Sequence, residues 1–217
     1  MTNVGNSIRE EKRVQHWENV YANHPLEKVG WYQPIPETSL DLIKEAKIPK
    51  DGAVLDVGGG DSLLVDHLLE RGYTDLTVLD ISDKAIQRAQ RRLGQDAQKV
   101  NWIHTDITQF KPTRTYDVWH DRACFHFLTE TVDIDSYFQI LNRSLKVDAT
   151  AIIGVFSKNG PDRCSGLDIK KYDKESLKNL MDDNFQLTHT FTVDHITPSR
   201  NTQNYIYACF KKQVNKH

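Results

Sequence analysis

Short apolar runs alternate with amphipathic segments along most of this chain. AVLDV (53–57), LTVLDI (76–81) and ATAIIGVF (149–156) show little polar alternation, which is typical of strands buried on both faces of a sheet. The segments that follow them repeat apolar residues at helical spacing. This alternation predicts an α/β fold in which a parallel sheet lies between two layers of helices.

The complete pattern predicts seven strands. The other strands are expected at 100–106, 116–121, 185–193 and 204–212, and the helices at 7–22, 38–47, 62–71, 83–93, 123–128, 133–145 and 173–181. No helix separates the last two strands, so we expect them to pair as an antiparallel hairpin. In a mostly parallel sheet of this kind, ligands bind at the carboxyl ends of the strands.

A glycine-rich loop follows the strand at 53–57. Gly58 permits a tight turn, and Gly60 permits a close approach of the backbone to a ligand. Asp56 and Asp61 flank the loop, and Leu63 stands where a dinucleotide-binding loop has its third glycine. Two carboxylates repel a phosphate and attract an ammonium and a sulfonium. The loop therefore favours S-adenosylmethionine (SAM) over NAD, although a strand–turn–helix junction without a ligand stays open.

The next two predicted strands also end in an acid. Asp80 is placed to accept hydrogen bonds from the two hydroxyls of a ribose, and its alternative role is to cap the following helix. Asp106 is placed to accept a hydrogen bond from the amino group of adenine, with Ile107 packing on the adenine ring. Its alternative is an ordinary turn residue. Three acids at three successive strand ends beside a glycine loop indicate one binding site.

Composition narrows the partners further. The net charge is −2 and no basic patch is visible, which argues against nucleic acid as a partner. The first twenty residues are polar and charged, and the longest apolar runs are too short for a membrane span, so neither a secretory signal nor membrane insertion is expected. The three cysteines have no metal or disulfide spacing. We expect a cytoplasmic protein, a monomer or homodimer.

The segments VLDVGGGDS, LTVLDIS, HTDIT and YDVWHDRACFHFL resemble the motifs of class I SAM-dependent methyltransferases. The resemblance covers nearly the whole chain. More narrowly, HWENVYANHPLEKVGWYQPIPETSL and GPDRCSGLDIKKYDKESL are similar to a bacterial subgroup of small methyltransferases. The resemblance implies a Rossmann-like seven-stranded sheet of order 3-2-1-4-5-7-6, with strand seven antiparallel and helices on both faces.

The resemblance also implies roles for individual residues. The motif around the glycine loop is the methionine-binding segment, the acid after strand two binds ribose, and the motif after strand four meets cofactor and substrate. An aromatic residue of the 23–37 loop is suited to stack on the sulfonium cation. The expected cofactor-binding residues are Asp56, Gly58, Gly60, Asp80, Ile81, Asp106, Ile107, His120 and Trp31.

Two features depart from the family pattern. Ser62 replaces the third small residue of the glycine loop, and it is small enough to preserve binding. KVDAT replaces the Pro-Gly-Gly turn before the fifth strand, which puts the register of that strand in doubt.

The candidates for a general base lie after the fourth strand. Asp121 is expected at the strand tip facing the site, with helix capping as its alternative, and His126 is a second candidate that also suits simple packing. His120 and His126 are separated by a spacing that does not aim both at one ion from a helix, so no metal site is expected. A soft nucleophile needs no base at all, so the need for one stays open.

The expected organisation is one methyltransferase domain over 1–217. Residues 1–50 form an N-terminal helical lid, 51–160 the SAM-binding core, and 161–217 a substrate-side segment and the terminal β-hairpin. Trp17 and Tyr21 are expected to pack the first helix onto the domain. The polar segment 157–172 should overhang the pocket, where Arg163 or Lys158 are candidates to hold an anionic substrate.

The sequence thus predicts an enzyme that transfers a methyl group from SAM, leaving S-adenosylhomocysteine (SAH), by in-line displacement. A small-molecule acceptor is favoured because no separate docking domain is visible, and a protein side chain stays open. The alternatives are an NAD-dependent oxidoreductase and a SAM-binding module without catalysis. The role of Cys164 is left open.

Overall fold

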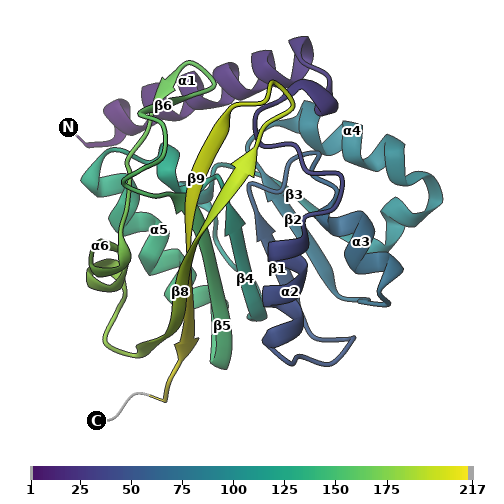
Figure 1. Cartoon of the computed structure of the whole chain (residues 1–217). Helices are drawn as coiled ribbons and strands as arrows, with labels where there is room; N and C mark the ends of the chain where they lie inside the picture. The colour runs from purple at the N-terminus through teal and green to yellow at the C-terminus, as the bar shows by residue number, and fades with distance from the viewer. Residues whose placement is uncertain (1, 215–217) are drawn as a thin grey trace.

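A seven-stranded sheet of order β3-β2-β1-β4-β5-β9-β8 forms the centre of the computed structural model of this chain (Figure 1). The structure describes residues 2–214, and side chains from residue 8 onward. Strands β1 to β5 are parallel, β9 is antiparallel to β5, and β8 is antiparallel to β9. This is the order and the hairpin expected from the sequence, with β9 and β8 in the places of strands seven and six.

The elements agree closely with the predicted segments. The helices are α1 (Thr2–Asn23), α2 (Glu37–Glu45), α3 (Leu64–Glu70), α4 (Asp83–Leu93), α5 (Thr131–Ser144) and α6 (Lys174–Leu180). The strands are β1 (Val54–Val57), β2 (Leu76–Asp80), β3 (Val100–His104), β4 (Tyr116–Arg122), β5 (Leu145–Phe156), β6 (Arg163–Cys164), β7 (Leu167–Asp168), β8 (Phe185–Ile196) and β9 (Thr202–Lys212). The expected helical segment 123–128 is a single 3-10 turn, Phe125–Phe127.

Two apolar cores form on opposite faces of the sheet, because successive strand residues point to opposite sides. Leu55 and Trp119 pack with α5 and α6 in one core. Val54 and Val118, their chain neighbours, pack with α2 and α3 in the other. All residues of β1 and β2 are buried, as the unbroken apolar runs predicted.

The fifth strand carries the irregularity expected from the KVDAT segment. Tyr116 pairs with Leu145, whereas Val118 pairs with Thr150, so β5 bulges between these positions. Asp148 has φ 62° within the bulge. The strand begins earlier than predicted, and regular pairing to β4 resumes at Thr150.

The first helix lies across the carboxyl ends of the strands (Figure 1). Arg88 of α4 donates to the carbonyls of Tyr21 and His24 at 2.9 and 2.8 Å, which fixes the end of α1. Nearer its start, Arg13 forms ion pairs with Asp106 and Asp133 at 2.8 and 2.7 Å. Residues 2–23 are therefore anchored over the edge of the sheet where ligands bind in this fold class.

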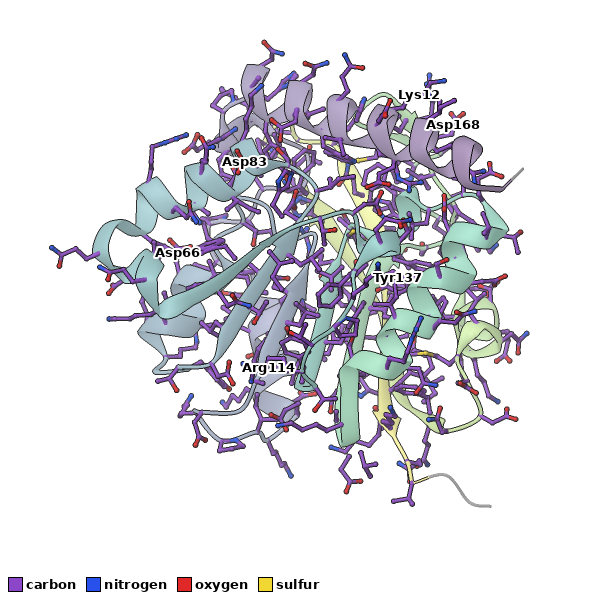
Figure 2. The ribbon with its side chains drawn as sticks, turned by 180° about the vertical axis from the view of Figure 1, so that it is seen from behind. Lys12, Asp66, Asp83, Arg114, Tyr137 and Asp168 are labelled. Carbon is purple, nitrogen blue, oxygen red and sulfur yellow. The ribbon has the colours of Figure 1, made fainter. Side chains whose placement is uncertain are left out.

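A short antiparallel ribbon, β6–β7, was not predicted. Arg163 pairs with Asp168 and Cys164 with Leu167, and the backbone of Ser165 at its tip lies against His16 of α1. Figure 2 labels Asp168 near Lys12 at the same end of the molecule, opposite Arg114. The segment after β5 therefore overhangs the carboxyl ends of the strands, as expected from the sequence. No helix of residues 2–214 is long and apolar enough to cross a membrane.

Candidate functional site

Two adjoining cavities lie at the carboxyl ends of β1 to β4; α1 lines the first, and the segment from Leu26 to Ser39 lines the second. The first encloses about 720 Å³ with its open mouth and reaches the ends of β2 and β3, at Asp80, Ile81, Asp106 and Ile107. The second, of about 500 Å³, reaches Asp56 and His120. Trp31, Gly58 and Arg122 line both.

The glycine loop has the conformation that its composition predicted. Gly58 and Gly60 have φ values of 65° and 53°. A Cβ on Gly58 would lie 2.5 Å from the Cβ of Cys124, and one on Gly60 would lie 2.4 Å from the Tyr21 hydroxyl oxygen and 3.2 Å from Asp80 Oδ2. The loop backbone is therefore packed against the cavity wall. Of the two, only Gly58 lines a cavity; Gly60 lies behind Asp80 and Tyr21.

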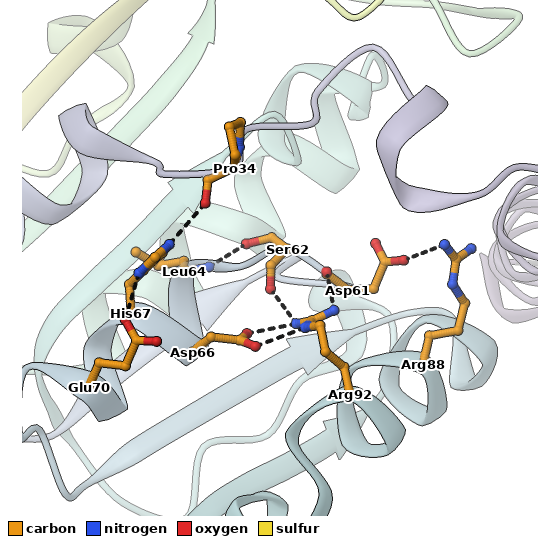
Figure 3. Close-up of polar contacts among 9 residues, drawn as sticks. All are labelled: Pro34, Asp61, Ser62, Leu64, Asp66, His67, Glu70, Arg88 and Arg92. Atoms are coloured by element: carbon orange, nitrogen blue, oxygen red, sulfur yellow. Dashed lines mark hydrogen bonds and ion pairs between the residues drawn. The ribbon is translucent and has the colours of Figure 1, made fainter.

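Asp61 does not present its charge to a ligand (Figure 3). Its carboxylate forms an ion pair with Arg88 at 2.8 Å, and Arg92 donates to its carbonyl oxygen at 2.8 Å. Burial raises the pKa of Asp61, and the two arginines oppose that rise. Of the two acids that flank the loop, Asp56 lines a cavity and Asp61 lines neither of the two. Asp61 instead fixes the loop to α4.

Asp56 and His120 form a buried pair at the floor of the second cavity. The distance between His120 Nδ1 and Asp56 Oδ1 is 2.7 Å, and the other ring nitrogen lies 2.8 Å from the Ser39 hydroxyl. Because β1 and β4 are neighbours with Asp56 opposite His120 in register, the fold itself brings these residues together. Both residues line the second cavity, and both were predicted from the sequence to belong to the site.

Asp80 is buried at the tip of β2. Its Oδ1 accepts the backbone N–H of Ser82 at 2.8 Å, and Ser82 rather than Asp80 caps α4. Burial raises the pKa of Asp80 to about 7; the backbone N–H groups of Ser82 and Gly60 oppose this, and Asp61 and Asp56 add to it. A buried carboxylate that lines a cavity and has a pKa near neutrality is a candidate ligand-binding group.

Asp106 is held by protein groups on both oxygens. Oδ1 accepts the backbone N–H and the hydroxyl of Thr108, each at 2.8 Å. Oδ2 accepts Arg13 Nε at 2.8 Å. Asp106 lines the first cavity, but both of its oxygens already accept from Thr108 or Arg13, which weakens the expectation that it accepts from an adenine amino group. Sequence reasoning missed Arg13, which carries no motif.

Aromatic side chains form the roof of the first cavity. Trp17 contacts Trp31 and Phe127 edge-on, with ring centroids 5.9 and 4.8 Å apart, and Tyr21 contacts Trp31 at 6.0 Å. All four line the cavity. Trp17 and Tyr21 therefore do more than pack the first helix, which was the favoured expectation. The π faces of such a cluster suit a cation.

Asp121 lies behind the cavity rather than in it, in contrast to the sequence expectation. Its Oδ2 accepts the Tyr137 hydroxyl at 2.8 Å, and its Oδ1 accepts the backbone N–H groups of Cys124 and Phe125 at 3.1 and 3.2 Å. Tyr137 belongs to α5, which lies on the face of the sheet turned toward the viewer in Figure 2. Burial raises the pKa of Asp121 to about 6, and the Tyr137 hydroxyl lowers it. These contacts make Asp121 a cap of the turn after β4.

His126 is likewise placed in the core and not at the cavity. Its Nδ1 accepts the backbone N–H of Phe156 at 3.3 Å, and its ring stacks on the Phe156 ring with centroids 4.4 Å apart. Burial and the charge of Arg122 lower the pKa of His126 to about 3. The ring is neutral with its lone pair used, so it has no means of acting as a base here. Its contacts are those of a packed core residue, the alternative left open from the sequence, but they are made with Phe156 of β5 and Tyr205 of β9.

The residues present fit SAM. The glycine backbone offers a close approach at Gly58, where a Cβ would collide, and Asp56 and Asp80 offer carboxylates to an ammonium and to ribose hydroxyls. Ile81, Ile107 and Leu128 supply apolar surface for a purine. Within residues 8–214, no group of three or more His, Cys, Asp or Glu side chains is arranged to hold a metal ion.

Comparisons with known proteins agree with this geometry. Residues 54–148 match the family described as "Methyltransferase domain". The chain is 30% identical over 118 residues to the mouse "eEF1A lysine and N-terminal methyltransferase", covering 54% of this chain and 17% of the relative. It is 23% identical over 119 residues to the "Ubiquinone biosynthesis O-methyltransferase" of Rickettsia canadensis, covering 55% and 49%. The chain thus spans less than half the length of these curated relatives.

A solved structure extends the likeness over the whole fold. The 1,6-didemethyltoxoflavin-N1-methyltransferase of Burkholderia thailandensis, solved with its substrate and SAH, has a TM-score of 0.70 at 16% identity, covering 99% of this chain and 91% of that one. The Rossmann-like methyltransferase fold predicted from the sequence is therefore confirmed.

Proposed function

Given that residues 54–148 form a methyltransferase domain within the class I SAM-dependent fold, we propose that this protein transfers a methyl group from SAM to a small-molecule acceptor. The family match supports an enzyme with SAM as its cofactor and favours this function over NAD-dependent oxidation. The observation that carries the proposal is the cavity beneath α1, with Asp80 at its wall and Asp56 in the adjoining cavity.

The chain's own residues divide the work of binding. We assign Asp80 to the ribose hydroxyls, Ile81 and Ile107 to the adenine faces, and Asp56 with the backbone at Gly58 to the methionine part. His120 positions the Asp56 carboxylate through their 2.7 Å contact. SAM supplies a methyl group that its sulfonium has already activated, so alignment and exclusion of water are the main tasks of the protein.

The lid performs the exclusion of water. We propose that residues 1–50, through Trp17, Tyr21 and Trp31, cover the reacting atoms and present aromatic faces to the cation. Residues 51–160 form the cofactor core, and 161–217 cover the acceptor side through the β6–β7 ribbon. A cavity closed by two such covers suits a small molecule better than a folded protein surface.

A protein side chain is the second candidate acceptor. The match to a relative named for eEF1A lysine and N-terminal methylation favours it. The test is methyl transfer from SAM labelled in its methyl group, with the purified chain added to a cell extract separated into metabolite and protein fractions. Label that enters the metabolites supports the proposal, and label that enters proteins alone overturns it. SAH binding without transfer to either fraction indicates a binding module.

Two smaller proposals concern the cellular compartment of the protein and the need for a general base in methyl transfer. Three free cysteines, Cys124, Cys164 and Cys209, suit a reducing compartment, so we propose a cytoplasmic location. Asp121 and His126 are engaged within the fold, so we propose that the acceptor's nucleophile reacts without a proton transfer to either of them.

A further inference from the structure

Arg122 is a half-buried cation at the end of β4. Its Nη1 donates to the carbonyl of Trp31 at 2.9 Å, the Tyr207 hydroxyl is a second hydrogen-bond partner of the guanidinium, and Nε and Nη2 are buried atoms. No carboxylate among the described side chains forms an ion pair with it. Burial acts to lower the pKa of Arg122, but Tyr205, Tyr207 and Cys164 hold that pKa above its usual value. A guanidinium that lines a cavity and has no carboxylate partner is suited to bind an anion there.

The Arg122 guanidinium rests on an aromatic ring on one side. The guanidinium lies over the Tyr205 ring, 4.9 Å from its centroid, and the Tyr205 hydroxyl is also buried without a partner. Arg122 lines both cavities, and Cys164 of the β6–β7 ribbon lines the first beside it. A carboxylate bound here would accept from a guanidinium in the two-pronged geometry that arginine favours.

The position in the sheet separates Arg122 from the three acidic candidate cofactor residues, whereas His120 shares its strand. Asp56 lies in β1, Asp80 ends β2 and Asp106 follows β3, on one half of the sheet. Arg122 ends β4 and packs over Tyr205 of β9, on the other half, beneath the segment that covers the acceptor side. Arg163, the cation that the sequence suggested for an anionic substrate, is exposed and already paired with Asp168 at 3.0 Å.

We propose that Arg122 binds an anionic group of the methyl acceptor, and that the acceptor is an apolar or aromatic molecule that carries a carboxylate. The aromatic side chains of Trp31 and Phe127 supply the apolar surface for its body. This inference rests on the proposed methyltransferase function and specifies its substrate class. The other source of a carboxylate is the methionine part of the cofactor, and the test separates the two.

The test uses benzoate as the probe and benzamide, its neutral analogue, as the matched control. Each is titrated by calorimetry into the full-length protein saturated with SAH. We expect benzoate to bind at least about tenfold more tightly than benzamide, because hydrogen bonds to a charged partner are the stronger ones. Arg122→Gln should remove this difference, Arg122→Lys should retain part of it, and Arg163→Gln should leave it unchanged.

Three results would overturn the proposal. The first is equal binding of benzoate and benzamide to the wild-type protein, which requires no variant to fold. The second is a fall in the SAH affinity of Arg122→Gln to that of methylthioadenosine, which lacks the carboxylate; Arg122 then serves the cofactor. The third is loss of benzoate selection in Arg163→Gln rather than in Arg122→Gln. If the wild-type protein does not bind SAH, the proposed function itself fails, and the substrate class with it.

Discussion

Affinity for SAH should rise with pH because of Asp80. Ribose hydroxyls donate to the ionised carboxylate, whereas burial raises the pKa of Asp80 to about 7. About 9% of Asp80 is ionised at pH 6 and about 91% at pH 8, by the titration of a single group. If only the ionised form binds, the apparent dissociation constant falls about tenfold between these values, or about 1.4 kcal/mol.

The same shift predicts how the ligand-free protein responds to pH. The folded state binds the Asp80 proton more tightly than the unfolded chain, whose ordinary pKa is 3.8. This contribution to stability is complete below pH ~4 and is lost as pH rises through about 7. It amounts to at most about 4 kcal/mol, at 1.36 kcal/mol per unit. Asp80→Asn should therefore unfold at higher denaturant than the wild type at pH 8, and weaken SAH binding.

Isothermal titration with SAH at pH 6, 7 and 8 is the assay. Wild type should show the tenfold rise, and Asp80→Asn should show weak, pH-independent binding. Asp121→Asn is the matched control, because it removes another buried acid whose pKa is raised, to about 6, but which does not line the cavity. The SAH affinity of this variant should still rise with pH. An affinity that is flat in the wild type, or that rises equally in Asp80→Asn, refutes the reasoning.

Three further predictions concern the loop, the lid and the turn after β4. Gly58→Ala places a Cβ in collision with a neighbour at positive φ and should cost on the order of 2–4 kcal/mol in chemical denaturation; Gly72→Ala, also at positive φ but with open space, should cost only ~1–2 kcal/mol. Equal losses would contradict the close packing of the loop. Arg13→Ala leaves two carboxylates unpaired and should speed hydrogen exchange in residues 8–23 at least tenfold; unchanged exchange would mean that other contacts hold α1. Asp121→Asn should lower the free energy of unfolding by about 1–3 kcal/mol while SAH affinity changes less than twofold, and a larger loss of affinity would return Asp121 to the site.

The regular parts of the fold were predictable because they rest on local pattern. Unbroken apolar runs indicated strands buried on both faces, and the absence of a helix between the last two strands indicated the hairpin. The β6–β7 ribbon was missed because two-residue strands have no alternation to detect. The turn of this ribbon consists of Ser165 and Gly166, with φ values of 50° and 80°. This Ser-Gly pair, of a kind found in tight hairpins, is the one feature of the sequence that indicates the turn.

The candidate site was predictable only where the sheet places residues by register. Strand ends meet at one edge, so Asp56, Asp80 and Asp106 could be expected together. The partners that decide what each acid does come from distant segments. Arg13, 93 positions before Asp106, binds its carboxylate, and Tyr137 of α5 turns Asp121 away from the cavity. No local pattern encodes such contacts, and they follow only from the packed fold.

The most direct test of the SAM site is a crystal structure of the full chain with SAH bound. The account predicts the ribose hydroxyls within hydrogen-bond distance of the Asp80 carboxylate, the purine between Ile81 and Ile107, and the amino group of the methionine part near Asp56. SAH found outside the cavity beneath α1, or inside it with the ribose away from Asp80, would contradict the central claim.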